Sequence, residues 1–345
     1  MTPTYSAYED LNDSQAAVDA VLGLLEEVER QDGVAPLGEA FIRGITHDQG
    51  HRHIIAIDGE IPADSPDPAA EPQAKIVGIL AIDEADSNRT AEVAVLPSRR
   101  HSGIAAELFK QAAHQLKLKG PIDVWAHGDL ASAQSFVANL DARRTRELLK
   151  MAVDIPLNSL RREQFEEEGR AGRRRITELG FEVLNYPESA DRYGQERVDE
   201  EWVRVNNEAF AWHPEQGGWD VNRLKEARDT DWFDPAGVLF LWGPGEAEGD
   251  QCLGFHWTKI PSEEHVKEEG ERAGEVYVVC LADTARGKGL GGPITMVGVA
   301  HLLSEGVGVV ELYVEGDNAP AVATYRKLGF EVVHTDVVYR GILKQ

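Results

Sequence analysis

The sequence contains little cysteine and no long apolar run. Its 345 residues include only two cysteines, Cys252 and Cys280. Their number argues against a disulfide framework and their spacing matches no metal-binding motif, so we expect two reduced, packed thiols and no bound metal. No stretch approaches the roughly 18 apolar residues of a membrane-spanning helix. The polar N-terminal segment lacks the basic and apolar regions of a secretory signal, so the sequence predicts a cytoplasmic protein.

Basic residues are also scarce relative to acidic ones. The chain has 35 Lys and Arg against 60 Asp and Glu, which gives a formal net charge of −25. Such a surface repels nucleic acid and anionic membranes, so neither is an expected partner. A polyanionic ligand would need a local cradle of backbone amides and a few basic side chains. The charge itself indicates no function. The partner that we expect is a small-molecule substrate, and the expected oligomeric state, which does not follow from the charge, is a monomer.

An internal duplication divides the chain. The length suits two domains of about 150 residues each. The pattern R-x-x-G-x-A at 100–105 recurs as R-x-x-G-x-G at 286–291, and WAHGD at 125–129 recurs as YVEGD at 313–317. Such self-similarity indicates a repeated fold. We predict a first domain over 1–155, a charged helical linker over 156–178, and a second domain over 179–345.

The candidate site lies in the second repeat, where EVYVVCLADTARGKGLGGPI at 275–294 predicts a strand, a glycine-rich turn and a helix. A helix N-terminus with free backbone N–H groups attracts phosphate, and glycines let the backbone approach a diphosphate closely. Arg286 and Lys288 add local positive charge. The alternative is an ordinary strand-to-helix turn. The candidate ligand-binding residues here are Val279, Cys280, Leu281, Arg286, Gly287, Lys288, Gly289, Leu290, Gly291 and Gly292.

Together with N-x-x-A-x-x-x-Y-x-x-x-G-F at 318–330, this turn resembles the GCN5-related N-acetyltransferase (GNAT) family. The resemblance implies an α/β fold of two tandem GNAT domains, each a mixed, mostly antiparallel sheet flanked by helices. It also implies acetyl-CoA as the acetyl donor. The donor-binding residues that it adds are Asn318, Ala319, Pro320, Ala321, Val322 and Ala323.

The same resemblance implies two catalytic residues. Tyr325 would be the general acid that protonates the leaving thiolate, and Glu275 the base that accepts the amine proton. The alternatives are a core tyrosine and a surface carboxylate at the start of a strand.

The first repeat lacks part of this pattern, because Val137 and Leu130 occupy the positions that correspond to Tyr325 and Asn318. We therefore expect a degenerate first domain that does not catalyse the reaction, whether or not it binds acetyl-CoA. Its candidate donor-binding residues are Val93, Ala94, Val95, His101, Ser102, Gly103, Ile104, Ala105 and Ala106.

A closer resemblance, covering nearly the whole chain, is to the mycothiol synthase family of tandem acetyltransferases. It rests on NNEAFAWHPEQGGWD at 206–220, DWFDPAG at 231–237, GFHWTKI at 254–260 and HTDVVYR at 334–340. It implies acetylation of the cysteine amine of a cysteinyl-glucosaminyl-inositol, the final step of mycothiol biosynthesis. The implied substrate contacts are Glu39, Glu215, Lys259, Glu275 and Tyr313. Trp212, Trp219 and Trp257 are candidates for a sugar pocket, although core packing is favoured for each.

Two other functions stay open. The protein could be a tandem acetyltransferase for another small amine, or an acetyl-CoA-binding sensor without turnover.

Overall fold

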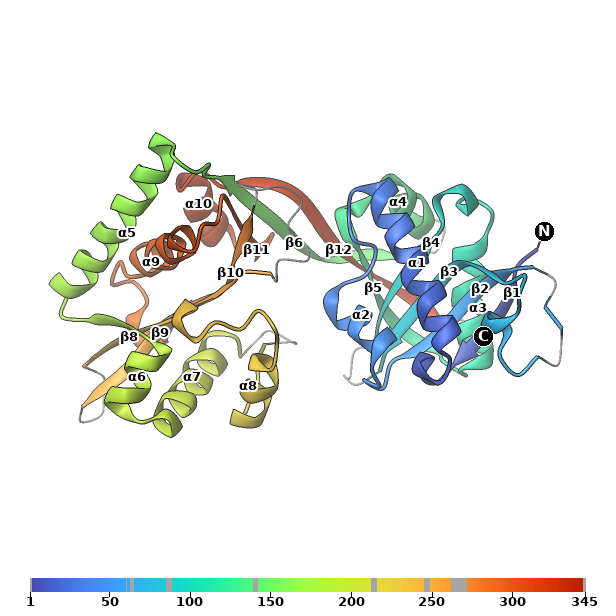
Figure 1. The fold of residues 1–345 in the computed structure, drawn as a ribbon, viewed down its shortest axis with the longest axis horizontal. Coiled ribbons are helices and arrows are strands. Elements are labelled where there is room, and N and C mark those ends of the chain that lie inside the picture. The colour runs from blue at the N-terminus through green and yellow to red at the C-terminus, as the bar shows by residue number, and fades with distance from the viewer. Residues whose placement is uncertain are drawn as a thin grey trace. The chain divides into compact units, whose positions relative to one another are not determined.

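The computed structural model describes residues 2–59, 61–62, 65–84, 89–138, 142–211, 216–244, 249–261 and 272–343. The chain forms two compact units, whose elements are labelled in Figure 1. The first unit comprises Met1–Leu149, Glu315–Asp317 and His334–Gln345. The second comprises Lys150–Val314 and Asn318–Val333.

The first unit is a sheet with helices packed against it. Its strands follow the order β1-β2-β3-β4-β5-β12, with β4 and β5 parallel and the other neighbours antiparallel. Helices α1 and α3 both contact β3. Ser14 caps the start of α1 and Gly33, in a left-handed conformation, ends it. The elements are β1 (Thr4–Tyr8), α1 (Gln15–Asp32), α2 (Glu39–Thr46), β2 (Arg52–Asp58), β3 (Lys75–Asp83), β4 (Thr90–Val95), α3 (Ile104–Gln115), β5 (Gly120–Ala126), α4 (Ala131–Ala138) and β6 (Arg143–Asp154).

Apart from two additional helices, α5 and α8, the second unit repeats this order of elements, which confirms the predicted duplication. Its strands follow the order β7-β8-β9-β10-β11, with β6 beside β11 from Lys150 onward. Aromatic residues around Trp202 form one apolar cluster, and aliphatic residues around Ile294 form another. The elements are α5 (Leu160–Glu178), β7 (Glu182–Asn185), α6 (Tyr186–Tyr193), α7 (Gln195–Ala209), α8 (Val221–Arg228), β8 (Val238–Pro244), β9 (Asp250–Lys259), β10 (Ala273–Leu281), α9 (Gly291–Ser304), β11 (Val309–Glu315), α10 (Ala319–Lys327) and β12 (Glu331–Leu343).

The last strand of the chain completes the sheet of the first unit. Residues Val337–Leu343 of β12 pair antiparallel with β5 (Figure 1). Arg340 Nε donates to Asp123 Oδ1 at 2.6 Å, and the Tyr339 hydroxyl donates to Asp129 Oδ1 at 2.7 Å. The boundaries predicted from the sequence therefore need correction, because residues from His334 onward belong to the first unit.

The predicted linker also differs from expectation. Most of 156–178 is the helix α5, as predicted, but α5 packs against α9 within the second unit. A Cβ atom added to Gly169 would lie 2.4 Å from Ala300 Cβ, and one added to Gly172 would lie 2.8 Å from the carbonyl oxygen of Pro293. Helix α5 is thus a packed element that supports the first turn of α9.

The Gly172→Ala substitution tests this contact. Because the new methyl group meets the backbone of α9, we expect the free energy of unfolding to fall by about 1–3 kcal/mol, the usual cost of overpacking. The control is Gly23→Ala in α1, where nothing lies within 4 Å of the added Cβ. An alanine there should be neutral or stabilising. Urea denaturation compares the two variants, and a Gly172→Ala protein as stable as wild type would contradict the contact.

Candidate functional site

The turn between β10 and α9 has the predicted strand–turn–helix geometry. Gly287 and Gly289 adopt φ angles of 76° and 73°, which residues other than glycine rarely adopt. Leu290 is buried and anchors the turn, and the first helical bond of α9 runs from the Ile294 N–H to the Leu290 carbonyl. The N–H groups of the first turn of a helix have no intrahelical partner. The turn therefore offers a compact set of donors to an anion.

The basic side chains of this turn lie at the surface. Arg286 pairs with Asp283 at 2.7 Å, and both side chains are more than half exposed. Exposed pairs of this kind contribute little, so Arg286 can exchange Asp283 for a more highly charged anion. Lys288 Nζ lies 5.7 Å from the Phe181 ring centroid. Two cations thus stand beside the donors of the turn.

Strands β10 and β11 separate next to this turn. They pair in parallel only from Ala273 to Val276 of β10, where a bulge follows. Beyond the bulge, Val278–Leu281 pair with β9 alone among the described strands. The backbone groups of β10 that face the gap are available to an extended ligand. Val279, Cys280 and Leu281, all predicted ligand contacts, lie on this segment.

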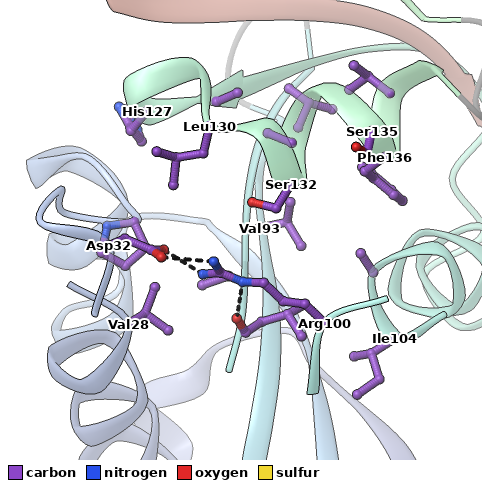
Figure 2. A pocket seen from close by; sticks show the side chains of 18 of the residues that line it. Val28, Asp32, Val93, Arg100, Ile104, His127, Leu130, Ser132, Ser135 and Phe136 are labelled. Atoms are coloured by element: carbon purple, nitrogen blue, oxygen red, sulfur yellow. Dashed lines mark hydrogen bonds and ion pairs between the residues drawn. The ribbon is translucent and has the colours of Figure 1, made fainter. Parts of the chain in front are cut away.

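Two neighbouring strands of the first unit, β4 and β5, also separate, and a cavity of about 500 Å³ lies beside them (Figure 2). Strands β4 and β5 pair only from Thr90 to Glu92 of β4. Of the predicted residues in this unit, the structure places Val93, Ala94, Val95, His101, Gly103, Ile104, Ala105 and Ala106 around the cavity. Ser102 is not among the lining residues, and its hydroxyl donates to the Arg99 carbonyl.

Both arginines of the first repeat's turn are paired with carboxylates. Arg100 donates to the two carboxylate oxygens of Asp32 at 2.8 and 2.5 Å and to the Val95 carbonyl at 3.1 Å (Figure 2). Arg99 forms an ion pair with Asp58. These carboxylates reduce the positive charge beside the cavity. Sequence reasoning missed both pairs, because Asp32 and Asp58 lie on other elements, far earlier in the chain.

A buried charged cluster at the cavity was also missed. His127 Nε2 lies 3.1 Å from Glu92 Oε1, and Nδ1 lies 3.5 Å from Asp336 Oδ1. Burial alone would lower the pKa of His127, but the hydrogen bonds and charges of Asp336 and Glu92 raise it to about 10. His127 is therefore an imidazolium at neutral pH and cannot act as a base.

In the second unit, Tyr325 lies on α10. It is half-buried, with its ring centroid 5.9 Å from that of Phe330. Burial raises the pKa of Tyr325 to about 12. None of the described residues hydrogen-bonds its hydroxyl. Asn318 caps the start of the same helix by accepting a hydrogen bond from the Ala321 N–H at 3.3 Å.

Glu275 belongs to a charged row that crosses the sheet of the second unit. It stands opposite Lys259 of β9 and opposite Glu311 of β11. Lys150 of β6 pairs with Glu311 at 2.8 Å. Residues directly opposite on neighbouring strands share one face of a sheet. The row Lys259–Glu275–Glu311–Lys150 thus places two carboxylates between two ammonium groups.

The other predicted substrate contacts are distributed over both units. Tyr313 of β11 is 41% exposed, and Lys150 Nζ lies 5.7 Å from its ring centroid. Glu39 is the first residue of α2, in the first unit. Glu215 and Trp212 lie outside the described residues. Trp257 is 1% exposed and is a core residue, as the sequence favoured. Trp219 is half-buried and packs against the same aromatic cluster.

The two cysteines are free and buried, as predicted. Burial raises the pKa of Cys252 to about 12 and that of Cys280 well above its usual range. Within the described ranges, no three His, Cys, Asp or Glu side chains are arranged to hold a metal ion. No helix in those ranges is long and apolar enough to cross a membrane.

Known proteins share this fold and much of this sequence. A sequence model of the acetyltransferase (GNAT) family matches residues 200–330. Two solved structures have a TM-score of 0.64 and 15% identity, and each covers 99% of this chain. One is a GCN5-related N-acetyltransferase from Sphaerobacter thermophilus, covered over 96% of its chain, and the other a tandem GNAT protein from the clavulanic acid biosynthesis pathway, covered over 99%. These two likenesses show the fold.

Curated relatives are much closer in sequence. The mycothiol acetyltransferase of Corynebacterium urealyticum is 56% identical over 99% of this chain and 100% of its own length. That of Corynebacterium jeikeium is 52% identical over the same shares. The chain therefore belongs to the mycothiol acetyltransferase family, within the GNAT acetyltransferases.

Proposed function

We propose that this protein catalyses the final step of mycothiol biosynthesis. It transfers an acetyl group from acetyl-CoA to the cysteine amine of the cysteinyl-glucosaminyl-inositol and releases mycothiol and CoA. The observation that carries the proposal is full-length identity of 56% to a mycothiol acetyltransferase. The second unit supports it with a diphosphate-type turn, a tyrosine hydroxyl and a carboxylate.

The residues of the second unit fit acetyl-CoA. The amides of Gly287 and of residues 289–292, with the side chains of Arg286 and Lys288, would hold the diphosphate. The unpaired edge of Val279–Leu281 would hold the pantetheine arm by strand-like hydrogen bonds, and the start of α10 at 318–323 would contact the same arm. Acetyl-CoA supplies the acetyl group as an activated thioester. Nothing in this assignment requires a metal ion.

Tyr325 is the proposed general acid. Its raised pKa, about 12, keeps the phenol protonated at neutral pH. The same buried surroundings destabilise a thiolate as well as a phenolate, so the Tyr325 hydroxyl is positioned to donate its proton as the charge on the departing sulfur develops. A hydroxyl without a partner among the described residues is free to make that hydrogen bond.

Glu275 is the proposed base. The acceptor amine is an ammonium in water and must lose a proton before it can attack a carbonyl. Glu275 is half-buried on β10, two residues before the strands separate. A carboxylate there can accept the amine proton directly or through one water. Lys259 and Tyr313 would bind hydroxyl groups of the acceptor. Glu39 and Glu215 stay predicted contacts of the same acceptor.

The first unit is proposed to take no part in the chemistry. Val137 lines its cavity where the second repeat has Tyr325, and His127 is an imidazolium rather than a base. The cavity is large enough for part of an acyl-CoA arm. A binding role without turnover fits these residues.

Direct product analysis tests the function. Purified protein is incubated with acetyl-CoA and the cysteinyl-glucosaminyl-inositol, and the products are identified by mass spectrometry. We expect a single N-acetylated thiol and stoichiometric CoA. Turnover on a panel of other small amines but not on this acceptor would favour a different acetyltransferase, and binding of acetyl-CoA without any product would favour the sensor.

A further inference from the structure

An aromatic pair stands beside the charged row of the second unit and has no role so far. Trp232 precedes β8, and its ring packs edge-on against Tyr277 with the centroids 4.9 Å apart. Both side chains are half-buried. Both pack against the aromatic cluster around Trp202 and keep part of their surface exposed. Partly exposed aromatic rings beside charged side chains are typical of ligand pockets, because they offer apolar area with little conformational freedom to lose.

A β-bulge in β10 leaves Tyr277 without a partner residue on β9. The register with β9 jumps between Val276 and Val278, so Tyr277 is the extra residue. A bulge re-aims a side chain. The Tyr277 ring consequently packs against Trp257, which lies opposite Val278, with centroids 5.0 Å apart. Tyr277 therefore shares the face of the sheet that carries Lys259 and Glu275.

The Lys259 ammonium connects this pair with the charged row. Its Nζ lies 5.1 Å from the Trp232 ring centroid and 5.6 Å from that of Tyr277, within range of cation–π attraction. The residue is only 6% exposed. Two ring faces thus fix the position of a buried cation that stands opposite Glu275. A ligand hydroxyl that reaches this ammonium on the side of the rings would also contact Trp232.

We propose that Trp232 and Tyr277 form the wall of the acceptor subsite and that Trp232 determines specificity for a polyhydroxylated ring. The apolar face of the ring packs against Trp232, its hydroxyls bind the Lys259 ammonium, and the amine is directed toward Glu275. This inference rests on the function proposed above. It adds a preference for a cyclic polyol over an open-chain amine of the same reactivity.

Steady-state kinetics of Trp232→Leu and Trp232→Phe test this wall. Each variant is assayed with the cysteinyl-glucosaminyl-inositol and with cysteinamide, which carries the same amine but no ring. For Trp232→Leu we expect the KM of the ring acceptor to rise about tenfold, with the KM of acetyl-CoA unchanged and kcat/KM on cysteinamide lowered far less. Trp232→Phe, which keeps a ring, should retain most of the affinity. Equal losses on both acceptors, or an unchanged KM for the ring acceptor, would overturn the proposal.

A second measurement does not depend on the folding of the leucine variant. Wild-type protein is labelled with fluorotryptophan, and the Trp232 resonance is identified by its loss in Trp232→Phe. We expect this resonance to shift on addition of the ring acceptor and not on addition of cysteinamide; no shift refutes contact with Trp232. Absence of wild-type turnover on the ring acceptor would instead refute the proposed function, so the two failures are distinguishable.

Discussion

Tyr325→Phe is expected to lower kcat by about a hundredfold to a thousandfold, the usual contribution of a general acid. The variant loses only the hydroxyl, and no described residue hydrogen-bonds that group. The ring keeps its edge-on contact with Phe330. Stability and the dissociation constant for acetyl-CoA should therefore stay at their wild-type values. Fixed-time product assays measure kcat, and calorimetric titration measures the dissociation constant for acetyl-CoA.

The matched control is Tyr193→Phe in α6. The Tyr193 hydroxyl donates to Asp250 at 3.0 Å near the surface of the same unit and has no proposed role in the reaction. Its removal should leave kcat unchanged. If Tyr325→Phe also left kcat unchanged, Tyr325 would be a packing residue and the proton donor would have to be another group.

Deletion of residues 334–345 is expected to unfold the first unit while the second remains folded. The deletion removes the β12 segment that pairs with β5, including Val337, which is fully buried. It also removes Asp336, which pairs with the buried His127 and accepts a hydrogen bond from the Gly128 N–H. Loss of one partner of a buried ion pair alone costs about 3–5 kcal/mol, against a typical domain stability of about 5–15 kcal/mol.

Hydrogen exchange with mass spectrometry measures this effect. Amides of β2–β5 should lose protection in the deleted chain, and amides of β8–β10 should keep theirs. The control deletes only residues 344 and 345 and should exchange like the intact protein. Unchanged protection of β2–β5 after the longer deletion would show that β12 is dispensable for the first unit.

Most of the elements of the fold could be predicted from local sequence patterns. The strand–turn–helix unit at 275–294 could be predicted, because alternating β-branched residues, glycines and an apolar helix pattern occur in direct succession. The repeat was visible for the same reason. Helix α5 was predicted as a helix, but its packing was not. Its buried stripe, Phe165, Gly169, Gly172 and Ile176, has helical spacing and was obscured by the surrounding charges.

Contacts between distant parts of the chain could not be read from the sequence. Nothing in the sequence around β12 indicates that its second half pairs with β5, because local patterns specify a strand but not its neighbour. The same holds for Asp336 beside His127 and for Asp32 beside Arg100. In the second unit the roles of Lys259 and Glu275 came from resemblance alone. Their position opposite each other became visible only in the strand register.

In the proposed complex the turn at 286–292 holds the diphosphate while the Tyr325 hydroxyl reaches the thioester sulfur. A crystal structure of the complex with CoA measures this directly, through the distance from Tyr325 Oη to the CoA sulfur. We expect a hydrogen-bond distance, about 3–3.5 Å for a sulfur acceptor, with the diphosphate on the backbone N–H groups of the turn. A diphosphate bound elsewhere in the second unit, or a Tyr325 hydroxyl directed away from the sulfur, would contradict it.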